Sequence, residues 1–349
     1  MGVNFGKWKL KQEHLERVLI GGAAALVLFL AARGAQAPLV EAPYEQAPAG
    51  VQTAAEPDIP MQQTTLYYRD GSGYLVPVTL SVPQQEGIAK ATLALMTGGI
   101  VNDMEAASLG LLTVAPMGTT YDLDISGGRA RVDLSREALN VLDAEQESAM
   151  VSAIVETLTT FDTVDTVEFL VGGQKRSKLT FGTDVSGVFT GGSLNMESVP
   201  AGADISGTET VMLYFPSESG RMLVPVTRVV YGEADINTAV FELIKGPKAD
   251  SGLQNAVPEN TALIDVSMKD GVAIVNLSKE FEQIVSQADG GKHALRAIQL
   301  TCSRFPGVES VQFQVEGKPY TIEGVPAKPT FINSAAEIEA WFPGVMEEE

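Results

Sequence analysis

The sequence is poor in the residues that cross-link a small domain or give it reactive chemistry. Among its 349 residues are one cysteine, Cys302, two histidines and two tryptophans. A single cysteine excludes an intramolecular disulfide and any zinc site built from several cysteines. The folded parts must therefore be stabilised by the packing of apolar side chains.

Positive charge is also scarce. Lysine and arginine total 24 against 44 aspartate and glutamate residues, so the formal net charge is −20. Such a chain repels nucleic acid and anionic lipid headgroups, which excludes nucleic acid as a partner. An acidic surface on its own indicates only solubility.

The N-terminus departs from this acidic composition. Residues 18–32 form an uncharged apolar run, preceded by four basic side chains, Lys7, Lys9, Lys11 and Arg17. This charge asymmetry predicts a cytoplasmic N-terminus and export of everything after the run. The run is short for a membrane span, and Ala35-Gln36-Ala37 resembles a signal-peptidase site. Residues 1–37 are therefore a signal peptide or an uncleaved membrane anchor, and both readings place the remainder outside the membrane.

Residues 38–62 are rich in proline and alanine and show no apolar periodicity. Proline blocks both helices and sheet ladders, so this segment is expected to be an extended tether.

The remainder contains an internal repeat. The sequence Leu-Val-Pro-Val-Thr occurs at 75–79 and again at 223–227, and four further pairs of segments match in the same order. Two copies of one domain are expected, at 63–185 and 210–326. The Gly- and Ser-rich residues 186–209 form the linker between them, and residues 327–349 an acidic tail.

Both copies share one pattern of expected elements. It consists of two β-prone runs, a helix, a hairpin, a second helix and a final strand. In the first copy these are expected at 64–69, 73–81, 85–97, 120–126, 129–134, 144–161 and 164–171, and in the second at 210–216, 221–230, 234–245, 262–268, 272–277, 287–304 and 308–315. Helices covering one face of a small sheet give an α+β two-layer sandwich.

Two pairs of residues refine this expectation. Pro77 and Pro225 lie inside strands, and because proline cannot donate to a ladder these strands are expected at a sheet edge or at a bulge. Ser135 and Ser278 follow the hairpins at positions suited to helix N-caps.

The second copy resembles the GerMN domain, found in tandem in sporulation and germination proteins. The matching positions are Leu243, Gly246-Pro247, Val257-Pro258, Asp270-Gly271, Val275 to Ser278, Phe305 to Val308 and Glu316-Gly317. The first copy departs at Gly99, at Ala115 to Gly118 and at Thr163, but keeps Val132 to Ser135.

The resemblance implies a fold similar to the ring-building domains of secretion machines. It also implies a role in the channel complex between mother cell and forespore. Proteins of this family resemble lipoproteins with an acylated cysteine, whereas this chain has no cysteine near residue 37. Anchoring by lipid is therefore excluded, and the apolar run must anchor the chain or be removed.

Few residues suggest reactive chemistry, and each has a plainer interpretation. His293 is the only histidine in the folded part, and its counterpart is Ala149, so it is expected on a helix surface. Cys302 replaces Leu158 on an apolar stripe and is expected to be a core residue. Asp122 and Asp124 alternate on a strand and resemble a cation site, but the second copy lacks them, which favours a solvated strand face.

Other charged residues also look solvated. Asp162, Asp165 and Glu168 have the spacing of exposed loop and strand charges, and Glu347 to Glu349 that of a terminal tail. No serine-hydrolase, zinc-protease or nucleotide-binding motif occurs. The sequence therefore predicts no catalytic, cofactor-binding or metal-binding residues, no cofactor and no enzymatic activity.

We expect a non-catalytic assembly protein on the outer face of the cell membrane, or secreted, with extracytoplasmic proteins as partners. The alternative is a module that binds cell-wall glycan beside peptidoglycan hydrolases. Such modules stack aromatic rings on sugars, and the available aromatics are Tyr67, Tyr68, Tyr74, Tyr214, Tyr231 and Trp341.

Overall fold

A computed structural model describes residues 60–342, apart from 200–201, 203 and 329–331. The apolar run at 18–32, the cleavage motif and nearly all of the expected tether lie outside these residues. Within the described part, no helix has the length and apolar character needed to cross a membrane.

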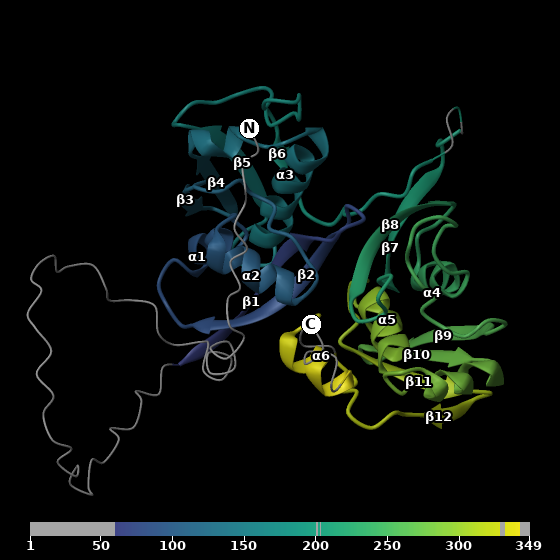
Figure 1. The fold of residues 1–349 in the computed structure, drawn as a ribbon. Coiled ribbons are helices and arrows are strands. Elements are labelled where there is room, and N and C mark those ends of the chain that lie inside the picture. The colour runs from purple at the N-terminus through teal and green to yellow at the C-terminus, as the bar shows by residue number, and fades with distance from the viewer. Residues whose placement is uncertain (1–59, 200–201, 203, 329–331, 343–349) are drawn as a thin grey trace, which may run out of the picture. The chain divides into compact units, whose positions relative to one another are not determined.

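The first half begins with an antiparallel hairpin of β1 (Met61–Arg69) and β2 (Leu75–Pro83), which forms a two-stranded sheet of its own. Helices α1 (Ile88–Leu95) and α2 (Ile100–Ser108) follow. The second sheet has the order β3-β4-β5-β6. Its strands are β3 (Tyr121–Ser126), β4 (Arg129–Leu134), β5 (Thr166–Val171) and β6 (Val188–Phe189), with the helix α3 (Ala144–Leu158) between β4 and β5 in the chain (Figure 1).

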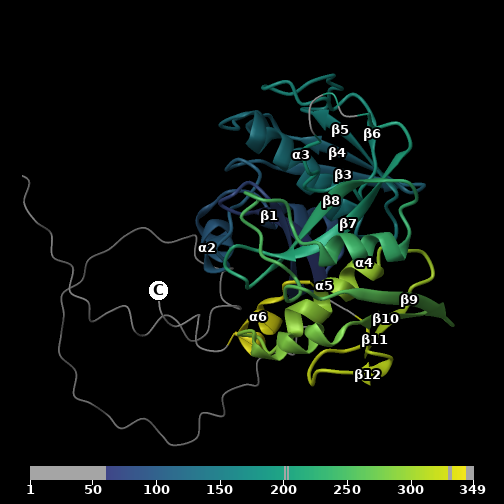
Figure 2. The same cartoon turned by 90° about the vertical axis from the view of Figure 1, so that its right-hand side faces the viewer.

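The second half repeats this order. A hairpin of β7 (Thr208–Pro216) and β8 (Leu223–Tyr231) precedes helix α4 (Ile236–Ile244). The second sheet has the order β12-β11-β10-β9, as Figure 2 shows. Its elements are β9 (Leu263–Lys269), β10 (Val272–Leu277), α5 (Lys292–Cys302), β11 (Ser310–Val315) and β12 (Lys318–Tyr320).

Matching pairings confirm the tandem α+β architecture. In both halves the hairpin strands β3–β4 and β9–β10 are antiparallel, and the strand after the helix joins in parallel, β4 with β5 and β10 with β11. Helix α3 contacts β1 as well as β5, and α5 contacts β7 as well as β11. The helices and the four-stranded sheet make two layers. The first hairpin of each half forms a separate two-stranded sheet that packs against the helices, and the sequence pattern did not predict this separation.

Strand β2 differs from its expected alternation. Residues Leu75 to Thr79 are all buried, and in β8 all of Leu223 to Arg228 are buried. A strand that faces water on one side alternates, whereas a strand covered on both faces does not. The hairpin register runs through Pro77 and Pro225 without a bulge, so both prolines lie on edge strands as expected.

The two serines occupy their expected places but do not cap. Ser135 precedes the 3-10 helix η2 (Arg136–Leu139) and Ser278 precedes η3 (Lys279–Ser286), without a capping bond from either side chain. The Ser135 hydroxyl accepts a bond from the Thr120 N–H, and the Ser278 hydroxyl accepts one from the Ala262 N–H. Each serine thus ties the end of its hairpin to the beginning.

The segment after the second half also departs from expectation. Within the range assigned to an acidic tail, Ala335–Trp341 form helix α6, whose N-cap Ser334 accepts a bond from the Glu337 N–H. Its apolar residues Ile338 and Trp341 are buried. This short helix packs on α5 and positions part of the site described next.

Candidate functional site at the domain junction

The residues considered for reactive chemistry do not form a site. No group of three or more His, Cys, Asp or Glu side chains among the described residues could hold a metal ion. Cys302 is fully buried, as expected of a core residue, and burial raises the pKa of its thiol to about 12. A thiol with that pKa is not a nucleophile at neutral pH.

His293 is not on the surface, so that prediction was wrong. It is 7% exposed, and its ring packs against Trp341 and Phe342 with centroids 5.2 Å away in both cases. Burial lowers its pKa to about 4, with Arg296 lowering it further and Asp289 opposing the shift. The error arose because helix α6, which covers this face of α5, was not expected.

Asp122 and Asp124 lie on the exposed face of β3, as the solvated-strand interpretation predicts. Their nearest cations are Lys90, 3.7 Å from Asp122, and Arg131, 4.0 Å from Asp124. Both ion pairs are largely exposed and contribute little to stability.

The other acidic residues expected to be exposed differ in their burial. Asp162 and Asp165 are exposed, whereas Glu168 is only 9% exposed and lies under the side chains of Lys175 and Arg131. Glu168 was expected to be exposed, and the two long cationic side chains that cover it explain the difference.

The structure does bring repeated residues together at the junction between the halves. Asn195, in the linker, accepts a hydrogen bond from the Leu75 N–H at 2.9 Å. Its amide donates to the Leu75 carbonyl at 2.8 Å and to the Pro225 carbonyl at 2.7 Å. One side chain therefore joins the edge of β2 to the edge of β8.

Asn333 makes the same three bonds with the two halves exchanged. It accepts from the Leu223 N–H at 2.8 Å and donates to the Leu223 and Pro77 carbonyls, both at 2.8 Å. Leu75 and Pro77 occupy the same positions in the first repeat as Leu223 and Pro225 in the second. The junction therefore has approximate two-fold symmetry within one chain.

The residues before the two asparagines extend the symmetry. The Thr227 N–H donates to the Leu194 carbonyl at 3.0 Å, and the Thr79 N–H donates to the Ile332 carbonyl at 3.0 Å. Each threonine hydroxyl also bonds the N–H of the same partner. We call the segments 194–195 and 332–333 the asparagine clasps.

Both clasps need an unusual backbone. Asn195 and Asn333 each have φ +50°, in the left-handed region that asparagine tolerates better than other non-glycine residues. This conformation lets the side chain bond the N–H and carbonyl of one residue together. The repeated Leu-Val-Pro-Val-Thr therefore has a shared role. Its backbone groups bond the two clasps, and its side chains are buried.

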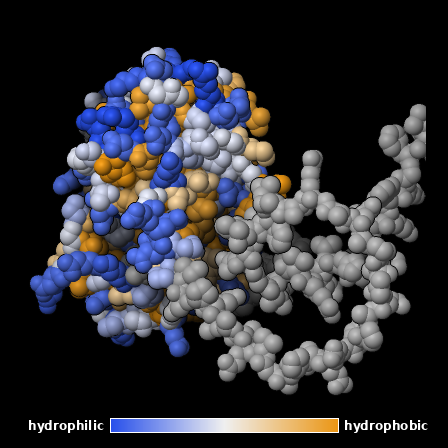
Figure 3. All heavy atoms as spheres, turned by 90° about the vertical axis from the view of Figure 1, so that its left-hand side faces the viewer, coloured by the Kyte–Doolittle hydropathy of each residue, from blue (hydrophilic) through white to orange (hydrophobic). Residues whose placement is uncertain are grey.

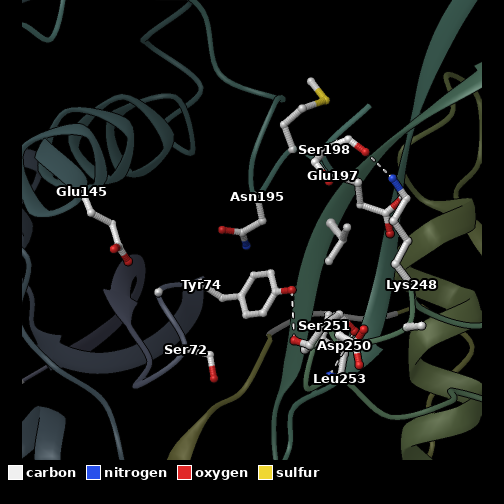
Figure 4. Close-up of a pocket in the computed structure, with 14 residues that line it drawn as sticks. Ser72, Tyr74, Glu145, Asn195, Glu197, Ser198, Lys248, Asp250, Ser251 and Leu253 are labelled. Carbon is white, nitrogen blue, oxygen red and sulfur yellow. Dashed lines mark hydrogen bonds and ion pairs between the residues drawn. The ribbon is translucent and has the colours of Figure 1, made fainter. Parts of the chain in front are cut away.

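A polar hollow of about 420 Å³ lies beside the first clasp. Figure 4 shows Glu145 reaching toward it from helix α3, with Tyr74 and Asn195 at its centre. The Tyr74 hydroxyl donates to the Ser251 carbonyl at 3.1 Å, and Lys248 lies 3.7 Å from Glu197. Tyr74, Lys248 and Glu197 are therefore engaged in contacts within the chain rather than directed into the hollow alone.

Arg228 fills a second part of the junction. Its guanidinium bonds both carboxylate oxygens of Glu197 at 2.8 Å, the Glu242 carboxylate at 3.2 Å and the Gly246 carbonyl at 3.0 Å. It also lies 5.6 Å from the centre of the Phe215 ring. This buried group fixes the linker residue Glu197 against the second half.

Most of the aromatics considered for sugar stacking are not available. Tyr68, Tyr214 and Trp341 are at most 8% exposed, and Tyr67 is half-buried against the core. Tyr231, 72% exposed, and Tyr74 remain.

The sequence was compared with models of known protein families. A family model described as Germane, sporulation and spore germination, matches residues 65–177 and 212–321, one match in each half. The chain belongs to the Germane family. The two matches confirm the resemblance to tandem GerMN domains drawn from the repeated residues.

The protein GerM is similar to most of this chain both in its sequence and in its solved structure. Spore germination protein GerM of Bacillus subtilis (strain 168) is 32% identical over 267 residues, which cover 72% of this chain and 71% of that protein. The solved tandem GerMN domains of the sporulation protein GerM from Bacillus subtilis superpose with a TM-score of 0.68 at 28% identity. The superposition covers 79% of this chain and 99% of the solved chain.

The clasps were not found from the sequence. Leu194-Asn195 and Ile332-Asn333 are a two-residue repeat, too short to stand out, and the second lies in a segment assigned to the tail. The conspicuous signal was their target, the repeated Leu-Val-Pro-Val-Thr.

Proposed function

We propose that this chain is a non-catalytic assembly protein of sporulation or spore germination. Membership of the Germane family supports a sporulation-related role, and the similarity to GerM over most of both chains points the same way. The finer part of the proposal is that the chain supports the channel complex between mother cell and forespore.

The observation that carries the proposal is the use made of the repeated positions. Leu75 and Leu223, with their following prolines and threonines, bind the asparagine clasps and hold two domains together. The repeated polar groups at the junction, Thr79, Thr227 and the two asparagines, are hydrogen-bonded to one another's segments. A duplicated domain whose shared residues serve folding and docking is what an assembly protein needs.

The proposed location is the outer face of the cell membrane. Its support is the apolar run at 18–32 with basic residues before it, which predicts export of both domains. The run serves as an anchor or is removed after Ala37, and N-terminal sequencing of the mature protein distinguishes these forms.

Complementation tests the role directly. The full chain, expressed in Bacillus subtilis lacking its own GerM, should restore heat-resistant spore formation. Versions lacking 63–185 or 210–326 should fail to do so and should not recover channel proteins after cross-linking. Restoration by a version with one domain deleted would contradict the tandem scaffold.

The alternative, binding to cell-wall glycan, has weaker support because three of its six aromatics are buried and Tyr67 is half-buried. Sedimentation with purified peptidoglycan tests it. A chain that sediments, and loses this property when exposed Tyr231 is changed to alanine, would favour glycan binding over the scaffold.

A further inference from the structure

The first half carries an open, mainly apolar groove of about 530 Å³. Its floor is residues 79–82 of β2 together with Tyr68. One wall is helix α2, through Val101 and Glu105, and residues 334–336 form the other. We call it the β2–α2 groove. Figure 3, which views the molecule from the left-hand side of Figure 1, shows exposed hydrophobic residues among hydrophilic ones.

The equivalent place in the second half is filled. Arg228 lies over the ring of Phe215, which occupies the position of Tyr68, and binds Glu197 from the linker. The side chains of Arg228 and Glu197 are 10% and 9% exposed. The N–H of Glu197 also donates to the Thr227 carbonyl at 2.9 Å, so the linker adds itself to the edge of β8.

The first half has neither the arginine nor the glutamate at the corresponding positions. Leu80 occupies the position that Arg228 has in the second half. Ala335, two residues after Asn333, occupies the position of Glu197, two residues after Asn195. Of the described residues 334–336, none donates a backbone bond to the Thr79 carbonyl, the counterpart of the Thr227 carbonyl. A leucine and an alanine stand in place of a charged pair, and among the described residues no side chain fills the groove.

Helix α2 lines the groove with Val101, and its residues Ile100 and Met104 add exposed apolar surface outside the groove lining. The second half has no helix between α4 and β9 in the described residues, so α2 is a feature of the first half alone. Ile100, Val101 and Met104 are 79%, 64% and 69% exposed. Asn102 fixes the helix by donating to the Ala94 and Thr97 carbonyls, so these apolar side chains are held in place.

We propose that the β2–α2 groove binds an extended, apolar segment of a partner protein, in the way that the linker segment at Glu197 occupies the second half. The proposal rests on the assembly role and names its binding surface. The partner backbone donates to the Thr79 carbonyl and its apolar side chains cover Leu80 and Val101. An acidic segment is disfavoured, because Glu105 lies on the groove and no arginine is present to pair with it.

Two labelled peptides provide the probes. The acidic probe is the linker sequence Asn195 to Val199, and the apolar probe is the same sequence with Glu197→Leu. Fluorescence anisotropy with the full chain should show the apolar probe binding at least about tenfold more tightly, a difference of about 1.4 kcal/mol. A photo-reactive version of the apolar probe should cross-link to residues 79–82 and 101–105.

Substitutions in the full chain should change this preference in a defined way. Leu80→Arg should reverse it toward the acidic probe. Leu80→Arg with Ala335→Glu should rebuild the ion pair of the second half and exclude both probes. Val101→Asp should weaken binding of the apolar probe about tenfold, whereas Leu142→Asp, at an 82% exposed position outside the groove, should leave it unchanged.

Several results would overturn the proposal. These are no saturable binding of the apolar probe, equal affinity for the two probes, or a preference that Leu80→Arg does not alter. Concentration-dependent dimers of the chain alone that Val101→Asp dissolves would identify a second copy as the occupant instead. Cross-links from the groove to residues before 60 would identify the chain's own N-terminal segment. Because these measurements use purified protein, their failure leaves the complementation test of the assembly role intact.

Discussion

Asn333 makes in the second clasp the same three hydrogen bonds that Asn195 makes in the first, with the two domains exchanged. Each asparagine bonds the N–H and carbonyl of a leucine in the domain it follows and one carbonyl of a proline in the other domain. Two equivalent domains are thus joined as in an isologous dimer, but within one chain.

Replacing either asparagine should therefore loosen the junction. Asn333→Ala removes three hydrogen bonds and leaves the buried Leu223 N–H without a partner, which costs about 2–4 kcal/mol of unfolding free energy. Asn195→Ala should cost less, because the groups around it are only partly buried. Urea titrations of the two variants measure both changes.

Asn260 provides the matched control. It also has positive φ, +65°, but it is exposed and has no side-chain hydrogen bond in the structure. Asn260→Ala isolates the cost of placing alanine in the left-handed region, about 1 kcal/mol. If Asn333→Ala is no more destabilising than Asn260→Ala, the clasp bonds do not hold the junction.

The repeated elements were largely predictable, because each half carries its own turn residues and periodic apolar positions. The hairpin strand expected at 129–134 is β4 at those residues, and the helix expected at 144–161 is α3 at Ala144–Leu158. Local sequence determines such elements, and the second copy checks the first. Elements present in one half alone, α2 and α6, had no second copy to reveal them.

The junction could not be predicted for a different reason. The bonds between Asn333 and Pro77 join residues far apart in the chain, and nothing local to either residue indicates the other. The uniform burial of β2 was equally hidden, because β2 contacts β8, a strand of the other half. Only the repetition of Leu-Val-Pro-Val-Thr indicated that its function was shared.

Arg228 tests the energetic importance of the buried charge group. Arg228→Leu leaves Glu197, whose side chain is 9% exposed, with Lys248 at 3.7 Å as its remaining cationic neighbour, so the unfolding free energy should fall by up to about 3–5 kcal/mol. Adding Glu197→Ala, which copies the Leu80 and Ala335 of the first half, should recover most of the loss. Guanidinium titrations of both variants decide the matter, and equal destabilisation of the two would show that the ion pair is unimportant.

Cys302 offers a label for opening of the second half. Its thiol is fully buried on α5, and burial raises its pKa to about 12, so the thiolate is nearly absent at pH 8. We expect no reaction with a thiol reagent in the native chain and full reaction in urea. Native labelling as fast as that of a free thiol would show that α5 is not packed as described.

His293 makes stability depend on pH. Its pKa in the folded chain, about 4, is below the ordinary 6.5, mainly because burial under Trp341 and Phe342 disfavours the charged ring. The unfolded chain therefore binds more protons than the folded chain between pH 6.5 and 4, and the unfolding free energy falls as the pH falls through this range. The loss approaches about 3 kcal/mol at the lower end, from the size of the shift.

Carboxylates titrate in the same range, so the effect of His293 is measured as a difference. Urea titrations of the chain and of His293→Gln from pH 7.5 to 4 should show a smaller decline in the variant, because glutamine cannot be protonated. Asp289 and Arg296, the charged groups nearest the ring, remain in both proteins, so the difference reports the ring together with its interaction with these groups. Parallel declines would mean that the ring is protonated equally in both states, and so that helix α6 does not bury it in solution.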